Sequence, residues 1–484
     1  MNTNYIEDNL IPHTIFILGY GAIGKCFTEI LVKQFPNAKV YVCDKNDLNV
    51  IPDKFTYIKK KVSKTNIQEI FQYLNKGDIL VDLSTNIDCL DIWELCMKNE
   101  VMYMNTAMEE WEDSENPNSF PKTKQELYMT SLAYRHDQAM MNSLWKPDEG
   151  STTSVFEHGM NPGLISHFVK KGLIDACNYF LSHENSPEYQ DLNHNLLNKY
   201  LEERNYPKIA KELGLHTIHC SEIDNQVIKN PPSDLKEKFY NTWSCRGFLT
   251  EGLVPIQIAK GSHEDNENDT FPRVRNNTCI MSWGPSKNYI AKSWNPFEDY
   301  EGLLIPHGEA FTINEFLTDK DSGYSPSQYY VYGINPHAKE FIENLPSKTS
   351  LQDCNPEMEV INPSKYEIKG YDKVGALLIF NKNRGWWSGT IMDEYDASLL
   401  LDYKYGPTVL QVAGGVFSCF LWMCKNPRKG NQWPEALDTD FILKVAKPFL
   451  GRIYSQFVDL NKTSIKNCFK FESFLASKNR NENI

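Results

Sequence analysis

Carboxylates and tryptophans recur in four stretches of this 484-residue chain, each beside an apolar run or glycines. A carboxylate pairs with an ammonium group, and an indole ring attracts a cation through its face. Together these residue types predict a cavity that binds an alkylammonium ion. The stretches are Ile218–Gln226, with Glu222 and Asp224; Asn241–Gly252, with Trp243 and Glu251; Leu303–Glu309, with His307; and Gly385–Gly389, with Trp386 and Trp387 and with Asp372 upstream.

Each of these residues also has an ordinary structural explanation. Carboxylates such as Glu222 and Asp224 are common in loops, and a tryptophan such as Trp243 is more often a core residue than a binding platform. A histidine that follows an apolar run, as His307 does, is commonly a hydrogen-bonded structural residue. The cation-binding cavity is therefore a hypothesis that rests on the four stretches taken together.

The elements that would position such a site begin with Ile15–Gly24, IFILGYGAIG. Four apolar residues suit a strand buried on both faces of a parallel sheet, and the apolar residues that follow at helical spacing predict a helix. In a turn between the two, the glycines permit a tight bend, close approach of a pyrophosphate and close helix packing. The phosphate would rest on the helix N-terminus. The predicted cofactor-binding residues of this loop are Gly19, Gly21, Ala22, Ile23 and Gly24.

A second predicted strand, Lys39–Asp44, ends in an acid about 20 residues beyond the last glycine, where a ribose-binding carboxylate is expected. Asp44 can accept hydrogen bonds from both ribose hydroxyls and would repel a 2′-phosphate. The sequence therefore favours NAD over NADP, a preference that the neighbouring Lys45 weakens. The alternative is an ordinary strand-to-helix turn followed by a solvent-facing Asp.

Predicted strands and helices continue to alternate up to Asn105, which indicates a Rossmann-type, doubly wound parallel sheet of the α/β class. Ligands of such sheets bind beyond the carboxyl ends of the strands. Ser84, Asn105 and Thr106 lie at such ends and are expected to line the cofactor cleft. The strands are Phe55–Val62, Asp78–Ser84 and Val101–Asn105, and the helices are Ile67–Leu74 and Ile87–Lys98.

Beyond Asn105 the pattern changes, and a turn at 159–163 is the predicted crossing to an inserted α+β domain. Before that turn we expect a surface loop at Glu109–Lys122, a long helix at Leu127–Trp145 and a strand at Thr153–His158. β-rich stretches such as Gly370–Asn381 follow, then helical patterns at Thr408–Met423 and Asp440–Tyr454 and a polar surface tail at 461–484. The predicted divisions are an NAD-binding domain at 1–160, a substrate domain at 161–404, and C-terminal helices at 405–484 that pack back on the first domain.

Length, charge and composition limit the classes of function that the chain could have. The length exceeds what one core usually holds, so two domains are expected, and a net charge of −13 argues against nucleic-acid binding. Twelve cysteines without a CxxC pair and an N-terminus without a signal peptide predict reduced thiols in a cytoplasmic protein. The apolar run Val409–Cys424 is too short for a comfortable membrane span and predicts a buried helix. No metal site is predicted.

Segments spread over most of the chain resemble the bacterial homospermidine synthases, which belong to a saccharopine dehydrogenase-like superfamily. Their combination is far more specific than the glycine-rich loop alone, although Cys177–Pro207 and Ser262–Thr270 do not match the family. The matching segments are 12–24, Tyr103–Trp111, Tyr134–Met141, His158–Gly163, Asn241–Gly252, Leu303–Ala310, Gly370–Phe380 and Leu410–Gly415.

This resemblance implies a saccharopine dehydrogenase-like fold, a homodimer formed through the second domain, and NAD that is regenerated within each turnover. The family joins two putrescines into homospermidine with loss of ammonia. One putrescine is oxidised to an imine, a second amine attacks the imine, and the new imine is reduced by the same cofactor. The second amine would be putrescine, spermidine or diaminopropane.

The resemblance also implies roles for single residues. Trp243 would be the central aromatic platform, Glu222 and Glu251 would hold amines, and Asn161 would lie near both nicotinamide and substrate. The implied catalytic residues are Trp243, Glu251, Glu222, Asn161 and His307, and the implied substrate-binding residues are Asp372 and Asp224. Which of the carboxylates, or His307, accepts the amine proton stays open.

Two other functions also stay open. A saccharopine- or carboxyspermidine-type dehydrogenase would consume NAD(P)H and bind a carboxylate, for which Arg135 and Arg246 are candidate partners. A non-catalytic NAD sensor would need the glycine loop and Asp44 but not the acids and tryptophans. The combination of acids and tryptophans favours the diamine enzyme.

Overall fold

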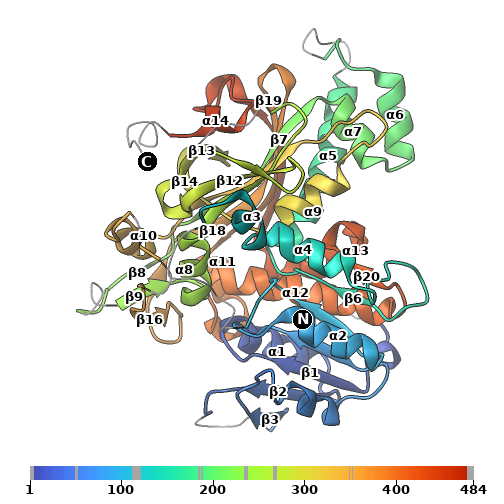
Figure 1. Cartoon of the computed structure of the whole chain (residues 1–484), viewed down its shortest axis with the longest axis vertical. Coiled ribbons are helices and arrows are strands. Elements are labelled where there is room, and N and C mark those ends of the chain that lie inside the picture. The colour runs from blue at the N-terminus through green and yellow to red at the C-terminus, as the bar shows by residue number, and fades with distance from the viewer. Residues whose placement is uncertain are drawn as a thin grey trace.

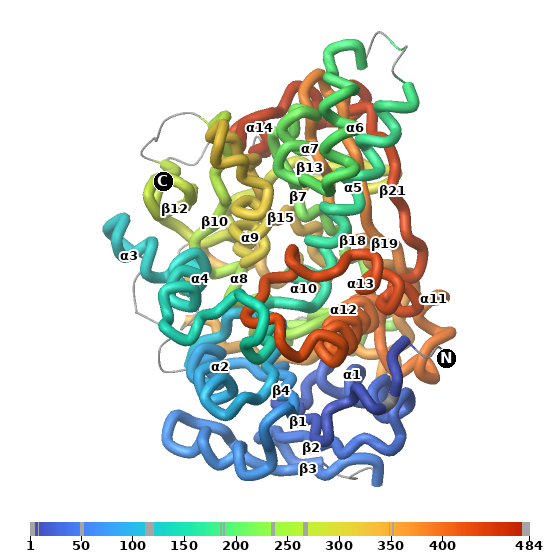
Figure 2. Tube along the Cα trace, turned by 90° about the vertical axis from the view of Figure 1, so that its right-hand side faces the viewer, coloured from blue at the N-terminus to red at the C-terminus, as the bar shows by residue number. Residues whose placement is uncertain are grey.

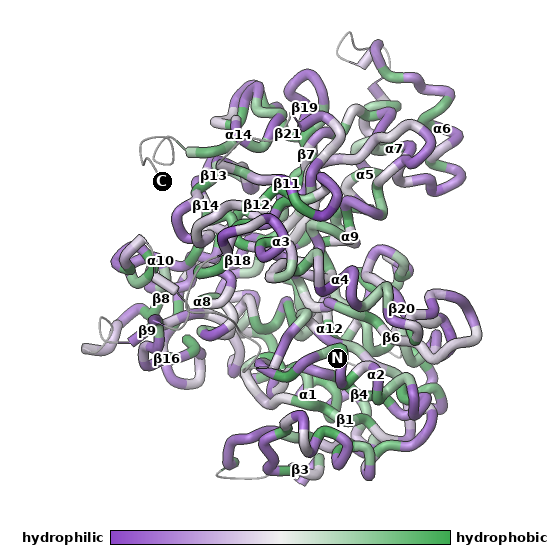
Figure 3. The backbone as a smooth tube through the Cα atoms, in the orientation of Figure 1, coloured by the Kyte–Doolittle hydropathy of each residue, from purple (hydrophilic) through white to green (hydrophobic). Residues whose placement is uncertain are grey.

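The computed structural model describes residues 5–48, 53–111, 121–183, 186, 189–233, 238–264, 270–347, 349–350 and 353–476. Its elements are arranged around two sheets, with the N-terminal sheet (blue) below and the larger sheet above in Figure 1. Helix α12 (Pro407–Lys425) lies between them in Figures 1 and 2. Outer elements such as α6 (His194–Glu202) are largely hydrophilic, as Figure 3 shows.

Within the described residues, seven strands form the first sheet, all parallel, in the order β3–β2–β1–β4–β5–β6–β20. This is the strand order of a doubly wound dinucleotide-binding sheet, so the predicted fold class is confirmed. The elements are β1 (Thr14–Leu18), α1 (Ala22–Gln34), β2 (Lys39–Asp44), β3 (Thr56–Lys59), β4 (Ile79–Asp82), α2 (Cys89–Lys98), β5 (Met102–Asn105), β6 (Ser154–Val155) and β20 (Asn431–Gln432).

Two predictions between these strands need correction. The long helix expected at Leu127–Trp145 is divided into α3 (Lys124–Met129) and α4 (Leu132–Met141), because the Ser131 hydroxyl caps the second helix by accepting from the Tyr134 N–H at 3.1 Å. The helix expected at Ile67–Leu74 is the 3₁₀-helix η2 (Ile67–Tyr73). Most of the predicted loop Glu109–Lys122 lies outside the described residues.

The larger sheet contains ten strands among the described residues and carries α5 (Leu164–Ser182) against β18 and β19. Its strands are β7 (Leu215–Asp224), β10 (Pro255–Ala259), β11 (Arg273–Val274), β12 (Cys279–Pro285), β13 (Ile290–Asn295), β14 (Glu298–Ile305), β15 (Ser327–Gly333), β18 (Tyr371–Phe380), β19 (Arg384–Asp393) and β21 (Arg452–Asp459). Smaller pairs are β8 (Val227–Ile228) with β17 (Ile368–Lys369) and β9 (Lys238–Asn241) with β16 (Glu357–Val360). The remaining helices are α7 (Tyr206–Glu212), α8 (Cys245–Leu253), α9 (Glu309–Phe316), α10 (Pro336–Glu343), α11 (Glu394–Ser398), α13 (Thr439–Ala446) and α14 (Phe471–Phe474).

Helix α12 returns to the first sheet, as expected from its apolar pattern. It packs on α1, where the rings of Phe420 and Phe27 lie 5.9 Å apart. Its length and its mean hydropathy of 1.5 would suit a membrane span, but 94% of the apolar stretch is buried inside the protein. That burial is typical of a core helix.

The C-terminal prediction is wrong beyond Phe449, where the 3₁₀-helix η7 (Lys447–Phe449) that follows α13 ends. Residues Arg452–Asp459 form β21, which pairs with β19, so this segment completes the larger sheet and does not lie as a helix on the first one. Phe471 and Phe474 are buried against that same sheet, and the tail is therefore not a surface segment as far as residue 476. The apolar residues of both stretches are interspersed with polar ones, so neither stretch has an uninterrupted apolar run. The division into domains otherwise stays a prediction.

Candidate active site

Glu222, Asp224 and Asp372 come together at the ends of two central strands of the larger sheet. Asp224 of β7 lies opposite Asp372 of β18 in antiparallel register. Glu222 lies two residues before Asp224, on the same face of β7. The exposed fractions of the three residues are only 1–3%. The strand register thus gathers three buried carboxylates in one place.

All hydrogen bonds that these carboxylates accept from the described part of the chain come from neutral donors. The donors to Glu222 Oε2 are Asn161 Nδ2 and Tyr330 OH, both at 2.7 Å. Those to Asp224 are the Gln226 side chain at 2.9 Å, the Gln226 N–H at 3.0 Å, Tyr332 OH at 3.5 Å and the Thr242 hydroxyl. Thr408 Oγ1 donates to Asp372 Oδ2 at 2.5 Å. Among the described residues, Asp372 Oδ1 has no hydrogen-bond partner. The cluster therefore holds acceptor capacity that it does not use internally.

The pKa values reflect this crowding. Burial raises the pKa of Glu222 to about 7 and that of Asp224 to about 6, and it raises the pKa of Asp372 well above its usual value. Neighbouring carboxylates add to the rise for Glu222 and Asp372. A buried like-charge cluster is costly until a counter-charge enters. In the described part of the chain, no group of three or more Cys, His, Asp or Glu residues is arranged to hold a metal ion. An ammonium group could supply such a counter-charge.

His307 lies between two further carboxylates. Its Nε2 is 3.3 Å from Glu251 Oε2, and its Nδ1 is 3.3 Å from Glu309 Oε1. Burial alone would lower the pKa of His307, but Glu309 and Glu251 outweigh burial and raise the pKa well above its usual value. His307 is therefore protonated at neutral pH. The sequence assigned no role to Glu309, although it stands two residues after His307 at the start of α9.

An aromatic wall connects these two groups of acids. Trp243 Nε1 donates to Tyr332 OH at 3.1 Å, and the Tyr332 ring stacks on Tyr330 with centroids 5.3 Å apart. The Tyr330 ring in turn lies 4.3 Å from the His307 ring. The sequence patterns did not single out either tyrosine. Their alternate positions on β15, which place them on one face, were the available signal.

Trp386 and Trp387 do not join the site. They occupy β19 opposite Leu378 and Leu377, well along β18 from Asp372, and both are buried. Trp386 Nε1 donates to Ser455 Oγ at 2.9 Å. Both therefore pack in the hydrophobic core, Trp386 in one cluster and Trp387 in another.

Asn161 reaches the acids from a turn that glycines hold in place. Its Nδ2 donates to Glu222 Oε2, as described above. A Cβ added at Gly415 of α12 would lie 2.1 Å from the Gly159 carbonyl oxygen, and one added at Gly163 would lie 2.5 Å from it. Only glycine allows this approach, which accounts for Gly415.

The glycine loop after β1 has the shape that a dinucleotide needs. Gly19 has φ +95°, and a Cβ there would lie 2.4 Å from the Leu83 carbonyl oxygen. Gly24 is equally confined, whereas the Cβ position of Gly21 has no atom within 4 Å. Helix α1 begins just after Gly21 and has no side-chain cap. Its first N–H groups are thus available to a pyrophosphate, and Ala22 and Ile23 lie in that first turn.

The remaining cofactor candidates stand at the carboxyl ends of three strands. Asp44, half-buried at the end of β2, accepts from the Tyr20 and Asn46 N–H groups at 2.7 and 2.8 Å. Ser84 donates to Asp82 at 2.6 Å. The neighbouring strand β5 ends at Asn105, whose buried Nδ2 has no hydrogen-bond partner within the described ranges. The half-buried Thr106 follows it. All of these residues share one edge of the sheet, and Asn105 offers a free donor there.

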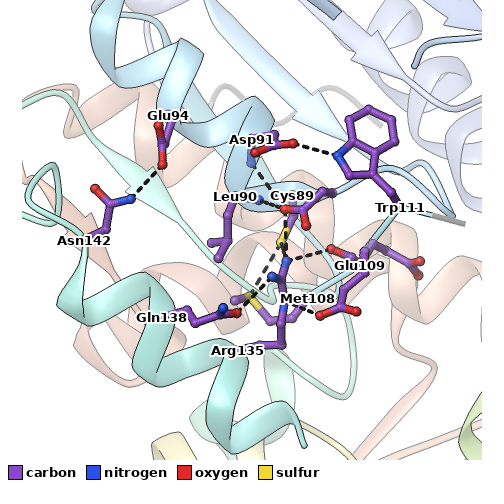
Figure 4. A network of polar contacts seen from close by, with 12 residues as sticks. Cys89, Leu90, Asp91, Glu94, Met108, Glu109, Trp111, Arg135, Gln138 and Asn142 are labelled. Carbon is purple, nitrogen blue, oxygen red and sulfur yellow. Dashed lines mark hydrogen bonds and ion pairs between the residues drawn. The ribbon is translucent and has the colours of Figure 1, made fainter. Parts of the chain in front are cut away.

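Arg135 of α4 ties together the loops that follow β4 and β5 (Figure 4). Its guanidinium lies 3.0 Å from Asp88 Oδ1 and 3.2 Å from Glu110 Oε1, and it donates to the Glu109 carbonyl oxygen at 3.1 Å. Two carboxylates of the chain therefore already pair with this arginine, which the sequence had suggested as a partner for a substrate carboxylate. That arrangement weighs against the saccharopine-type alternative.

The chain is similar to known proteins over nearly its full length. The chain matches the family model for the saccharopine dehydrogenase NADP binding domain over residues 15–152 and that for the saccharopine dehydrogenase C-terminal domain over 159–458. It is 26% identical over 479 residues to the homospermidine synthase of Mesorhizobium japonicum, covering 95% of this chain and 93% of that protein. The corresponding values for the homospermidine synthase of Blastochloris viridis are 27% over 472 residues, with 93% and 92% covered. The crystal structure of the homospermidine synthase of Legionella pneumophila in complex with NAD is similar with a TM-score of 0.73 and 25% identity, covering 92% of each chain.

Proposed function

Since the chain belongs to the saccharopine dehydrogenase family, we propose that it is a homospermidine synthase, a transferase that joins two putrescines with release of ammonia and uses NAD as a recycled redox cofactor. The buried cluster of Glu222, Asp224 and Asp372 carries this proposal, because it needs a cation and receives hydrogen bonds only from neutral donors in the described residues. The similarity to homospermidine synthases over nearly the full chain supports it.

NAD is the cofactor, and the loop Gly19–Gly24, Asp44 and Asn105 would hold it. The chemistry that NAD supplies when bound is the acceptance of hydride from the amine-bearing carbon and the return of that hydride to the new imine. The family model is described as NADP binding, but the Asp44 carboxylate at the ribose position repels a 2′-phosphate. We therefore assign NAD.

The acids have different roles in substrate binding and proton transfer. Glu222, Asp224 and Asp372 bind one end of the diamine, Trp243 and Tyr332 line its apolar middle, and Glu251 holds the other amine. Oxidation requires a neutral amine, and an acceptor with a pKa near 7 suits that task best. Glu222 fits this requirement, whereas His307 already carries its proton. We assign the proton acceptor to Glu222 Oε1, because Asn161 and Tyr330 donate to the other oxygen.

Burial of these groups also keeps water away from the reactive imine. Water in the site would hydrolyse the imine to an aldehyde and leave the cofactor reduced. Glu222, Asp372, His307 and Glu309 are each at most 8% exposed, so the chain keeps this region largely dry. A homodimer, a cytoplasmic location, and use of spermidine or diaminopropane as the second amine are further parts of the proposal and rest on the family resemblance.

Product analysis tests the proposed function. The protein is incubated with putrescine and a small amount of NAD, and homospermidine, ammonia and NADH absorbance are followed. We expect homospermidine and ammonia in equal amounts, far above the NAD supplied, without accumulation of NADH. Accumulating NADH together with free aminoaldehyde would instead indicate a simple diamine dehydrogenase.

The cofactor preference depends on Asp44. We expect Asp44→Ala to weaken NAD binding about tenfold or more, because charge-assisted hydrogen bonds to the ribose are worth about 1.5–3 kcal/mol, while binding of NADP is unchanged or improved. Titration of each dinucleotide measures this change. Asp47→Ala removes a nearby exposed carboxylate that pairs with Lys59 and should leave the preference intact. Unaltered discrimination in Asp44→Ala would mean that another group recognises the ribose.

The raised carboxyl pKa values make stability depend on pH. Because the folded-state pKa values of about 7 for Glu222 and about 6 for Asp224 exceed their ordinary values, the folded protein binds more protons than the unfolded chain, and this contribution to stability is lost as pH rises toward 7. Putrescine restores the missing counter-charge. We therefore expect putrescine to raise Tm more at pH 8 than at pH 5, and less so in Glu222→Gln. Equal shifts at both pH values would contradict this role.

A further inference from the structure

Glu157 is a buried residue to which the proposed function assigns no role. It follows β6, and its exposed fraction is 2%. Its φ of +57° lies in the left-handed region, which glycine and asparagine adopt more readily than glutamate. Its backbone N–H donates to Asn105 Oδ1 at 2.7 Å. The backbone of Glu157 is thus attached to the same side chain whose Nδ2 is free at the cofactor edge.

The side chain of Glu157 points to the other half of the site. A Cβ added at Gly308 would lie 2.2 Å from each of its two carboxylate oxygens, so the carboxylate rests directly on the backbone between His307 and Glu309. His136 Nε2 lies 2.7 Å from Glu157 Oε2 and holds the carboxylate in this position. The His136 ring itself contacts Trp433, at 4.6 Å between centroids, and Phe311 of α9, at 6.1 Å.

We propose that Glu157 is a positioning residue that sets the distance between the cofactor edge at Asn105 and the His307 segment. This inference rests on the proposed function, because the oxidised carbon must lie within reach of both the nicotinamide and the groups that manage the amine proton. One residue spans the gap, with its N–H on Asn105 and its carboxylate on Gly308. The backbone alone would favour glycine or asparagine at this position, so the carboxylate contact explains why a glutamate stands there.

Substitutions at position 157 separate positioning from stability. Glu157→Asn suits the left-handed backbone but is too short to reach Gly308. We expect its Tm to fall, because the buried His136 loses its carboxylate partner. Its NAD affinity and putrescine KM should stay within about twofold, and its kcat should fall about tenfold, in line with the cost of misplaced reacting groups. Glu157→Gln keeps the length and should recover most of that loss.

A buried carboxylate elsewhere provides the matched control. Asp78 accepts from the Thr14 N–H at 2.8 Å just before β4, at the opposite edge of the same sheet. Asp78→Asn should lower Tm while kcat stays within about twofold, because packing there does not reach the reacting groups. Wild-type kcat in Glu157→Asn would overturn the inference, as would a fall in kcat of the same size in Asp78→Asn.

The contact with Gly308 is tested by combining two substitutions. In the wild-type background, Gly308→Ala should lower both Tm and kcat, because the added methyl group collides with the Glu157 carboxylate. In the Glu157→Asn background the methyl group has room, so its effect on Tm should largely disappear. Additive effects would overturn the inference. Failure of the proposed function is distinguishable, since it would appear as a wild-type protein that forms no homospermidine, while the Tm coupling is measured without turnover.

Discussion

Replacing Glu222 with glutamine is expected to lower kcat for homospermidine formation by about three orders of magnitude, because general-base catalysis by a positioned carboxylate contributes about 10²–10⁴-fold. The amide keeps the size of the side chain and cannot accept the amine proton. NAD affinity should be unchanged, because Glu222 lies on β7 of the larger sheet, whereas the glycine loop follows β1 of the first sheet. Steady-state kinetics and NAD titration measure the two effects.

The controls for Glu222 separate its charge from its place in the fold. Glu222→Asp keeps a carboxylate on a shorter side chain and should retain more activity than Glu222→Gln. Glu264→Gln removes a buried carboxylate whose partners are Ser327 and the Phe471 N–H, and its kcat should remain within about twofold of wild type. Substantial activity in Glu222→Gln would assign the proton acceptor elsewhere, with Glu251 next in place.

Replacing Trp243 with alanine has the second largest expected effect. A desolvated cation–π contact is worth about 2 kcal/mol, which corresponds to about a 30-fold loss in kcat/KM, and loss of the hydrogen bond to Tyr332 adds to it. Trp243→Phe keeps an aromatic face and should lose less. NAD should still bind to both variants.

A core tryptophan serves as the control for this prediction. Trp386→Phe should change Tm without changing kcat/KM, because Trp386 packs between Tyr179 and β21 and lies outside the site. Equal losses in Trp243→Ala and Trp243→Phe would show that the π face is not what the substrate uses.

Local features of the chain were predictable from the sequence. The turn at Gly19–Gly24 is built from consecutive residues, and the strand Lys39–Asp44 has the predicted bounds, because burial on both faces leaves an uninterrupted apolar pattern. The same holds for α12, whose burial matches its composition. Predictions of this kind depend on neighbours along the chain.

The assembled site depends on contacts that no local pattern records. Asp224 meets Asp372 only because β7 and β18 pair in one particular register, and a shift of one residue would turn one of the two carboxylates away. Tyr330, Tyr332 and Glu309 were missed because tyrosines on a strand and a carboxylate at a helix start have ordinary structural explanations. For the same reason, the sequence could not exclude Trp386 and Trp387, which pack in the core.

Retention of deuterium tests the central claim, internal recycling of the cofactor, most directly. The protein is incubated with NAD, added unlabelled NADH, and putrescine that carries deuterium on both amine-bearing carbons. The homospermidine formed is then analysed by mass spectrometry. The account predicts that every deuterium atom of the two putrescines is retained in the product, because the same bound cofactor takes and returns it. Loss of one deuterium per product, replaced by hydrogen from the added NADH, would contradict it.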